Sequence, residues 1–235
     1  MQCCNALPNS AVPVNSPQFH FRAKDPGSAL THFIGFCAAI VATPWLLVRA
    51  SVQRVDLAGM VSLSVFMLSM ILLYGASTTY HSLDVNPRVN KRLKKIDHMM
   101  IFVLIAGTYT PFCTLVLGGS AGKRLLITIW VIALAGLVLK ACWVTCPKWF
   151  SSVIYIAMGW ACVSDIPRIF VTASAPVFGW LLAGGLFYTV GGVIYAMKLK
   201  VFNSKFRYFG SHELFHVFVM AGSLCHYIMM CCCIG

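Results

Sequence analysis

The sequence has few charged residues for its length. Only 10% of its 235 residues are Asp, Glu, Lys or Arg, whereas 59% are hydrophobic. A soluble domain carries about 25% charged residues and uses them to cover its surface. A chain of this composition cannot cover a water-soluble globule, so we expect lipid to surround most of it.

Acidic residues are the scarcest charged group, and 18 basic against 6 acidic residues leave a formal net charge of +12. In a soluble protein, such a balance would suggest a nucleic-acid partner. Here the basic residues stand between apolar stretches, and no basic stripe alternates with exposed aromatic residues. We therefore expect membrane lipids as partners and no nucleic acid, and we leave self-association into a homo-oligomer open.

Disulfide and secretion signals are also missing. The 11 cysteines include no C-x-x-C motif, and most lie inside apolar stretches. Buried, reduced thiols are therefore the expectation. The N-terminal region has no continuous apolar core of the kind that a signal peptide needs. We expect residues 1–28 to form a flexible tail and residues 29–235 to form one transmembrane domain.

Seven apolar stretches follow the tail. They run over Ala29–Leu47, Leu57–Tyr80, Met99–Leu117, Leu125–Trp143, Trp149–Val163, Val177–Met197 and Leu214–Ile234. Most approach the ~20 residues that a helix needs to cross about 30 Å of hydrocarbon. Backbone groups in lipid must be satisfied internally, and no stretch alternates like a barrel strand. We predict an all-α integral membrane bundle of seven transmembrane helices, in which the fifth helix is short because Asp165 and Pro167 follow it at once.

The basic residues are distributed unevenly between the two sides of this bundle. The tail and the second, fourth and sixth connections hold thirteen of the 18 Lys and Arg residues, and the other connections hold five. Cytoplasmic loops carry the excess of Lys and Arg in membrane proteins. The sequence therefore predicts a cytoplasmic N-terminus, an outside C-terminus and a multi-pass location in the plasma membrane.

Polar residues that interrupt apolar stretches are costly in lipid and are candidates for function. They are Ser77 and His81 at the end of the second stretch, Asp97 and His98 at the start of the third, and His212, Glu213 and His216 at the start of the seventh. The predicted orientation puts all of them at the cytoplasmic face. The charge bias and the placement of polar residues thus indicate the same layer.

The spacing of the histidines indicates a metal site. His212 and His216 are four residues apart, so both imidazoles can point at one ion from a single helix face. His81 is the best third ligand, because two histidines at this spacing plus a third from elsewhere are a recurrent zinc arrangement. Water in the fourth position would mark a catalytic site. Alternatively, Asp97 pairs with a neighbouring lysine, and Ser77 donates to a carbonyl one turn earlier.

Residues 212–216 also match H-E-x-x-H, the pattern in which Glu activates water in zinc proteases. A zincin takes a further ligand from downstream, yet no carboxylate follows Glu213, and Gly222 stands where a metzincin places its third histidine. We therefore expect no protease. His32 and His226 are interpreted as packing or hydrogen-bonding residues.

Several motifs, in this order, resemble the bacterial hemolysin III family within the progestin and adipoQ receptor superfamily, which includes the adiponectin receptors. They are Ala76-Ser77-Thr78-Thr79-Tyr80-His81, Lys94-Lys95-Ile96-Asp97-His98, Ile105-Ala106-Gly107-Thr108-Tyr109-Thr110-Pro111-Phe112, Ala157-Met158-Gly159-Trp160 and Ser211-His212-Glu213-Leu214-Phe215-His216. The resemblance covers about residue 25 to the end and favours the bacterial branch.

This resemblance implies seven helices and an intramembrane zinc near the cytoplasm. Its three histidine ligands fall on His81, His212 and His216, and its conserved Ser and Asp fall on Ser77 and Asp97. Family members often carry Glu and Asn ahead of a Thr/Ser-His pair in the first span. Asp25 and Ser28 stand there in this chain, before Thr31 and His32.

Two functions follow as expectations. In the first, zinc-bound water attacks a lipid amide or ester in ceramidase-like chemistry, with Asp97 and Ser77 as catalytic residues. In the second, the zinc is structural, and the protein is a receptor, a channel or a pore-forming cytolysin. The sequence gives pore formation little support, because no span carries a repeated polar face.

Overall fold

The computed structural model describes residues 23–197 and 210–235, and these residues form helices and no strand. The elements are α1 (Pro26–Val52), α2 (Leu57–Ser82), α3 (Pro87–Pro111), the π-helical η1 (Phe112–Leu117), α4 (Gly119–Cys142), α5 (Lys148–Gly159), the 3₁₀ turn η2 (Ala161–Asp165), α6 (Ile166–Thr172), α7 (Ala175–Met197) and α9 (Ser211–Cys233). Seven spans among the described residues are long and apolar enough to cross a membrane, which confirms the predicted all-α bundle. The tail up to residue 22 and the basic residues Lys198, Lys200, Lys205 and Arg207 lie outside the described residues.

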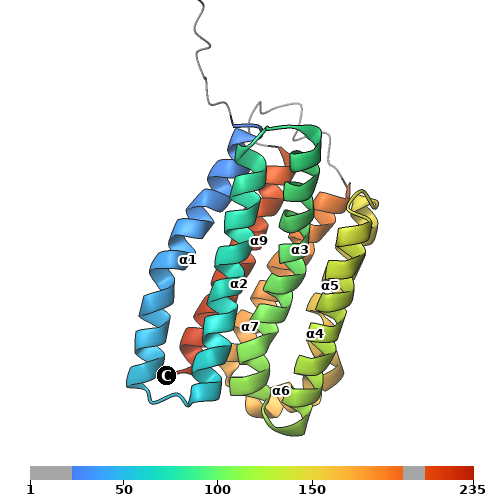
Figure 1. Cartoon of the computed structure of the whole chain (residues 1–235). Helices are drawn as coiled ribbons and strands as arrows, with labels where there is room; N and C mark the ends of the chain where they lie inside the picture. Colours follow the sequence, from blue (N-terminus) through green and yellow to red (C-terminus); the bar gives the residue numbers. More distant parts are fainter. Residues whose placement is uncertain (1–22, 198–209) are drawn as a thin grey trace, which may run out of the picture.

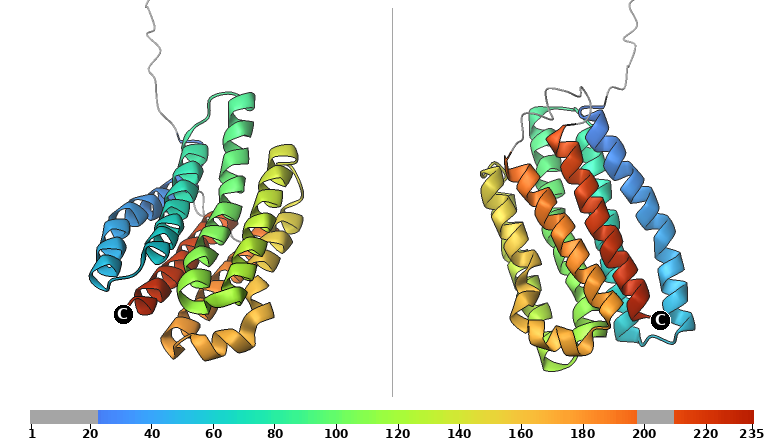
Figure 2. Two further views of the ribbon diagram at one scale, coloured as in Figure 1. Left: turned by 60° about the horizontal axis from the view of Figure 1, so that its bottom comes forward. Right: turned by 180° about the vertical axis from the view of Figure 1, so that it is seen from behind.

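The helices stand side by side, and the first and last helices of the chain are neighbours (Figure 1, Figure 2). α1 packs on α2 and α9, α2 packs on α3, and α7 packs on both α9 and α5, while α4 packs on α3. We name the top of the bundle in Figure 1 the upper end; α1, α3 and α9 begin there and α2 ends there. Parts of the chain that are far apart in sequence therefore meet at this end.

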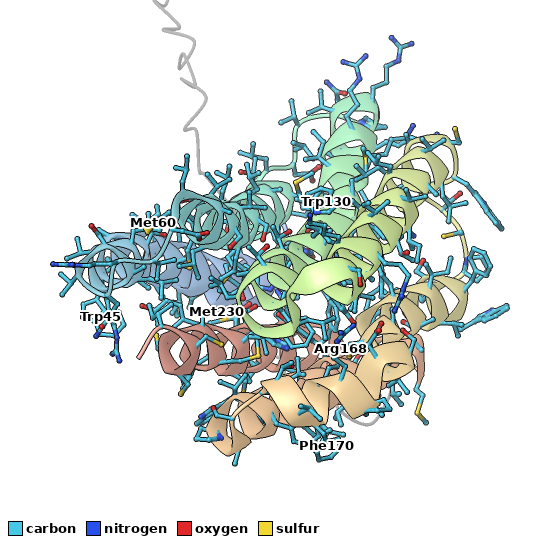
Figure 3. All side chains as sticks on the ribbon, turned by 90° about the horizontal axis from the view of Figure 1, so that it is seen from below. Trp45, Met60, Trp130, Arg168, Phe170 and Met230 are labelled. Atoms are coloured by element: carbon cyan, nitrogen blue, oxygen red, sulfur yellow. The ribbon has the colours of Figure 1, made fainter. Side chains whose placement is uncertain are left out.

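The outer surface of the bundle is apolar. Trp45 and Phe170 point outward and are 52% and 64% exposed, whereas Met230 points into the bundle and is fully buried (Figure 3). Large apolar side chains are exposed on every one of the seven spans. Soluble monomers rarely expose contiguous apolar patches of this extent, so the exposed faces fit a lipid environment.

Several helices begin earlier than hydropathy predicted, among them α1, α3 and α4, which begins at Gly119 rather than Leu125. α1 begins at Pro26, three residues before the first apolar stretch. α3 begins at Pro87, where the Asn86 side chain accepts a hydrogen bond from the Val89 amide at 2.9 Å and proline occupies the first turn. Asp97 therefore lies about three turns inside α3 rather than at its start.

The fifth span is longer than predicted and is not straight. It extends over Lys148–Thr172, and the short η2 turn interrupts its α-helical hydrogen bonding. Asp165, which suggested an early end, is buried at this break and accepts a hydrogen bond from Arg124 of α4 at 2.6 Å. The carboxylate is thus paired, which is how buried charges in membrane proteins are tolerated.

Glycines allow α7 and α9 to approach closely. A Cβ atom at Gly184 would lie 2.5 Å from the His226 ring, and one at Gly191 would lie 2.9 Å from Phe218 Cβ. Small residues at helix interfaces in membranes permit such contacts. This packing fixes the position of α9, which carries two of the predicted metal ligands.

Candidate metal centre

Three histidines meet at the upper end of the bundle. His81 lies in the last turn of α2, and His212 and His216 lie in the first two turns of α9. One ring nitrogen of each lies within 4.8 Å of the corresponding nitrogens of the other two. The structure thus brings together the three ligands that the sequence predicted.

The spacing of two of these nitrogens fits a metal ion. His81 Nε2 and His212 Nε2 are 3.3 Å apart. Two nitrogens bound to one tetrahedral zinc at 2.0–2.1 Å lie about 3.3–3.4 Å apart by simple trigonometry. The pair already has the separation that a shared ion requires.

Asp25 orients His81. Its Oδ2 lies 2.9 Å from His81 Nδ1, and the Asp25 backbone amide donates to the His81 carbonyl at 2.9 Å. A carboxylate at Nδ1 favours the proton there and leaves Nε2 as the free acceptor. Asp25 therefore prepares His81 to bind a cation through Nε2.

Thr31 orients His216 in the same way. The Thr31 hydroxyl donates its single proton to the Ser28 carbonyl at 3.0 Å and lies 3.2 Å from His216 Nδ1. Because the hydroxyl proton is already used, His216 Nδ1 must be the donor in this contact, and Nε2 is left as the acceptor. His216 thus also presents an unprotonated Nε2.

His32 fixes the plane of the His216 ring. The two imidazoles stack with centroids 3.6 Å apart and planes 5° apart. His32 is buried, and neither of its ring nitrogens has a hydrogen-bond partner among the described residues. His226, deeper in α9, stacks on Tyr188. The packing interpretation of both histidines agrees with these contacts.

Asp97 and Ser77 lie beside the three histidines without the partners that the sequence alternatives gave them. Asp97 is 8% exposed, and its Oδ2 lies 3.3 Å from His98 Nδ1, while Lys95 donates to the Ala141 carbonyl instead. Ser77 is 1% exposed, and its hydroxyl has no partner in the described part of the chain, so it makes no bond to a carbonyl one turn earlier. The Ser77 hydroxyl is therefore available to a ligand, and Asp97 contacts a histidine in place of the neighbouring lysine.

Glu213 is occupied away from this chemistry. Its Oε2 accepts a hydrogen bond from the Gly210 amide at 2.7 Å and caps α9, and its Oε1 accepts one from the Ser28 hydroxyl. Because the Glu213 carboxylate caps α9 and bonds to α1, it is poorly placed to activate water. This arrangement agrees with the expectation that H-E-x-x-H does not mark a protease here.

A cavity of about 150 Å³ is lined by two of the three histidines, His212 and His216. Ser77, Asp97 and His216 line it at the upper end, and Phe178 and Met229 line it deeper in the bundle. Most of the lining side chains are aliphatic or aromatic. A cavity with polar side chains at one end and apolar side chains along the rest suits an amphiphilic molecule whose polar group lies at the histidines.

Sequence reasoning did not assign roles to Asp25 and Thr31. Each contacts the second nitrogen of a candidate ligand histidine, and neither lies in the helix of that histidine: Asp25 is the N-cap residue of α1 and Thr31 lies in its second turn. The only signal was their place at the start of the first span, where an acidic residue precedes a Thr-His pair.

Comparisons with known proteins agree with this architecture. Residues 21–227 match the family model described as haemolysin-III related. The chain is 36% identical over 203 residues to hemolysin-3 of Bacillus cereus, covering 86% of this chain and 88% of that protein. It is 36% identical over 196 residues to a hemolysin-3 homolog of Bacillus subtilis (strain 168), covering 83% and 87% of the two chains.

A more distant relative comes from animals. The chain is 25% identical over 223 residues to the adiponectin receptor protein of Drosophila melanogaster, covering 86% of this chain and 49% of that protein. The seven apolar spans and the bacterial relatives indicate a multi-pass protein of the plasma membrane. The match over most of its length shows that the chain belongs to the haemolysin-III-related family.

Proposed function

We propose that this protein is a zinc-dependent hydrolase of lipid amides or esters. The observation that carries the proposal is the position of the three histidines, which converge at one end of an apolar cavity beside an unpaired serine and a buried aspartate. Three imidazole ligands leave one position of a tetrahedral zinc open, as catalytic zinc sites do.

His81, His212 and His216 would hold the zinc through nitrogens that face one another. Asp25 and Thr31 keep the Nδ1 protons of His81 and His216 in place, so that Nε2 of each remains a lone-pair donor. When bound, zinc polarises a carbonyl oxygen and lowers the pKa of a water ligand to about 7.

Asp97 is the acceptor for the proton of the attacking water. It lines the cavity together with His212 and His216, and its ion-pair partner in the described part of the chain is His98 rather than a lysine. A carboxylate in this place can orient a water molecule and receive its proton. The Ser77 hydroxyl, which has no acceptor of its own among the described residues, can donate to the oxygen of the scissile group.

The substrate class follows from the cavity. Its deep part is lined by apolar side chains such as Phe178 and Met229, which favour a hydrocarbon chain over a polar substrate. A lipid whose amide or ester group stays near the polar end of the bundle would place its carbonyl at the histidines. The basic residues favour a cytoplasmic position for this end.

A second function has its own support. The histidines and their partners join α1, α2 and α9, so a zinc ion here would tie three helices together. A structural zinc in a receptor, a channel or a cytolytic protein would need this arrangement and no chemistry. The relatives named hemolysin-3 leave cytolysis among these options.

One assay distinguishes the two proposed functions. Purified protein is mixed with a panel of ceramides and phospholipids in detergent, and fatty-acid release is followed by mass spectrometry. The hydrolase proposal predicts release that a chelator abolishes, that added zinc restores, and that Asp97→Asn removes while zinc content is retained. Stoichiometric zinc without fatty-acid release from any lipid in the panel would overturn the hydrolase and favour the structural zinc.

A further inference from the structure

A buried lysine lies in the last turn of α4, outside the metal centre. Lys140 is 1% exposed although its helix ends at the upper surface of the bundle. An ammonium group removed from water is costly unless an anion or several hydrogen bonds compensate it. None of the chain's six carboxylates, all of which lie in the described residues, forms an ion pair with Lys140.

The groups that compensate Lys140 are a thiol and a hydroxyl. Lys140 Nζ lies 3.0 Å from Cys146 Sγ and 2.6 Å from Ser151 Oγ, and these two acceptors are 3.1 Å from each other. Of the two, only the thiol can ionise near neutral pH. The ammonium therefore has one available anionic partner, the thiolate of Cys146.

The surroundings of Cys146 favour the thiolate as well. Cys146 directly precedes Pro147, the N-cap residue of α5, so the positive end of that helix dipole lies beside the sulfur. Burial raises the pKa of the Cys146 thiol, but the hydrogen bonds to Lys140 and Ser151, the positive charge of Lys140 and a backbone hydrogen bond together lower it by more, so the pKa lies below its ordinary value.

The other titratable groups near this cluster are cationic or neutral. Lys95 of α3 donates to the Ala141 carbonyl, and Lys148 of α5 lies over the ring of Tyr195 of α7. The ring of Tyr155 is 5.9 Å from Lys140 Nζ. Among the described residues, no carboxylate forms an ion pair with Lys140 or Lys95, so neither ammonium is drawn away from the sulfur by an acidic side chain.

We propose that Cys146 is a modification site, a thiolate paired with the Lys140 ammonium that is oxidised by hydroperoxides to a sulfenic acid. The thiolate sulfur attacks one oxygen of the peroxide, the S–O bond forms, and the O–O bond breaks. The sulfur loses two electrons to the peroxide, and the departing hydroxide or alkoxide takes a proton from the Lys140 ammonium. Cys–SOH and a neutral amine remain beside water or an alcohol.

The exposure of Cys146 selects the oxidant. The residue is 8% exposed, which admits a molecule of the size of hydrogen peroxide more readily than a bulky electrophile. Cys142, four residues earlier, is exposed, and no hydrogen bond to Lys140 is found for it. The chain therefore contains its own control, because accessibility alone would make Cys142 the more reactive thiol.

The test treats full-length protein in nanodiscs with hydrogen peroxide for a fixed time, removes the peroxide, and then unfolds the protein in detergent that contains dimedone, so that the label reaches every sulfenic acid. Labelling at each cysteine is measured by peptide mass spectrometry. The thiolate is the form that reacts with peroxide, so we expect Cys146, whose sulfur accepts a hydrogen bond from Lys140, to be oxidised several-fold faster than Cys142 at pH 7. Lys140→Met should slow labelling of Cys146 about tenfold and leave Cys142 unchanged, and Lys140→Arg should restore most of the rate.

A second variant protects the test against a folding failure of Lys140→Met. Ser151→Ala removes one hydrogen bond from the sulfur and keeps the ammonium, so it should slow Cys146 labelling by a smaller factor. The pH at which labelling of Cys146 reaches half its maximum should rise in Lys140→Met. Equal rates at the two cysteines, or a Cys146 rate that none of these variants changes, would overturn the proposal.

Discussion

Removing the Asp25 carboxylate should weaken metal binding without removing a ligand. Asp25 Oδ2 lies 2.9 Å from His81 Nδ1 and fixes the tautomer that leaves Nε2 free. Loss of such a partner typically lowers metal affinity 10–100-fold, which corresponds to about 1.4–2.7 kcal/mol. Because the Asp25 side chain is 45% exposed and partly screened by water, we expect Asp25→Ala to fall in the lower half of this range, about 10–30-fold.

Asp25→Asn separates the hydrogen bond from the charge. Asparagine keeps an oxygen that can accept from His81 Nδ1, so its affinity loss should be smaller than that of Asp25→Ala, roughly threefold to tenfold. The backbone bond from the Asp25 amide to the His81 carbonyl remains in both variants. The junction of α1 and α2 is therefore expected to stay in place.

The assay is competition for zinc against a fluorescent chelator, with purified protein in detergent at pH 7.5. Asp84→Asn is the matched control, because Asp84 is an exposed carboxylate next to the same end of α2 and bonds only to Asn90 in the described residues. Wild-type affinity in both Asp25 variants would refute the argument that Asp25 prepares His81. An equal loss in Asp84→Asn would show that net charge, not orientation, sets the affinity.

Three further predictions concern the metal and the topology. His212→Ala should lose most bound zinc and should lower the melting temperature, whereas Asp97→Ala should retain zinc with a weaker affinity. Elemental analysis and thermal unfolding of both variants check these outcomes. Stoichiometric zinc in His212→Ala would show that the metal site lies elsewhere. Glu213→Gln should keep nearly full zinc content and reduce any hydrolysis only mildly, and complete loss of hydrolysis with zinc retained would revive the protease-like role. A reporter enzyme that works only outside the cytoplasm should be active when it is fused to the C-terminus. An inactive fusion would contradict the predicted orientation.

The ligand histidines were predictable from the sequence because their signal is local. His212 and His216 share a helix face by spacing alone, and His81 ends an apolar stretch that the placement of lysines assigned to the same predicted side of the membrane. The seven spans were predictable for a similar reason, since hydropathy over about 20 residues is a sum of many side chains.

The start of α3 was harder to place, because a helix that extends beyond the lipid leaves no hydropathy signal. Its first turns contain charged and polar residues, so only the Asn86-Pro87 cap marks where it begins. Hydropathy also placed the end of the fifth span too early. The charge of Asp165 is compensated by Arg124, a residue 41 positions away that the local sequence does not reveal.

The residues that prepare the site were not predictable because their partners are remote. Asp25 and His81 are 56 positions apart, and Thr31 and His216 are 185 positions apart. Nothing in the sequence near Thr31 specifies which helix it will face. Lys140, Cys146 and Ser151 lie within eleven positions along the chain. Their proposed role could not be predicted from the sequence, because it depends on the burial of Lys140 without a carboxylate partner.

The closeness of the first and last helices has a consequence for biosynthesis. α1 supplies Asp25 and Thr31, α2 supplies His81, and α9, the final span, supplies His212 and His216. During membrane insertion the chain holds the early polar residues without their partners until α9 has been made, so the centre is completed only after the seventh span arrives. Long-range closure of this kind is slow relative to local helix formation. Metal uptake therefore reports complete assembly, and a chain truncated before α9 should insert its earlier spans yet leave Asp25 and His81 exposed to quality-control proteases.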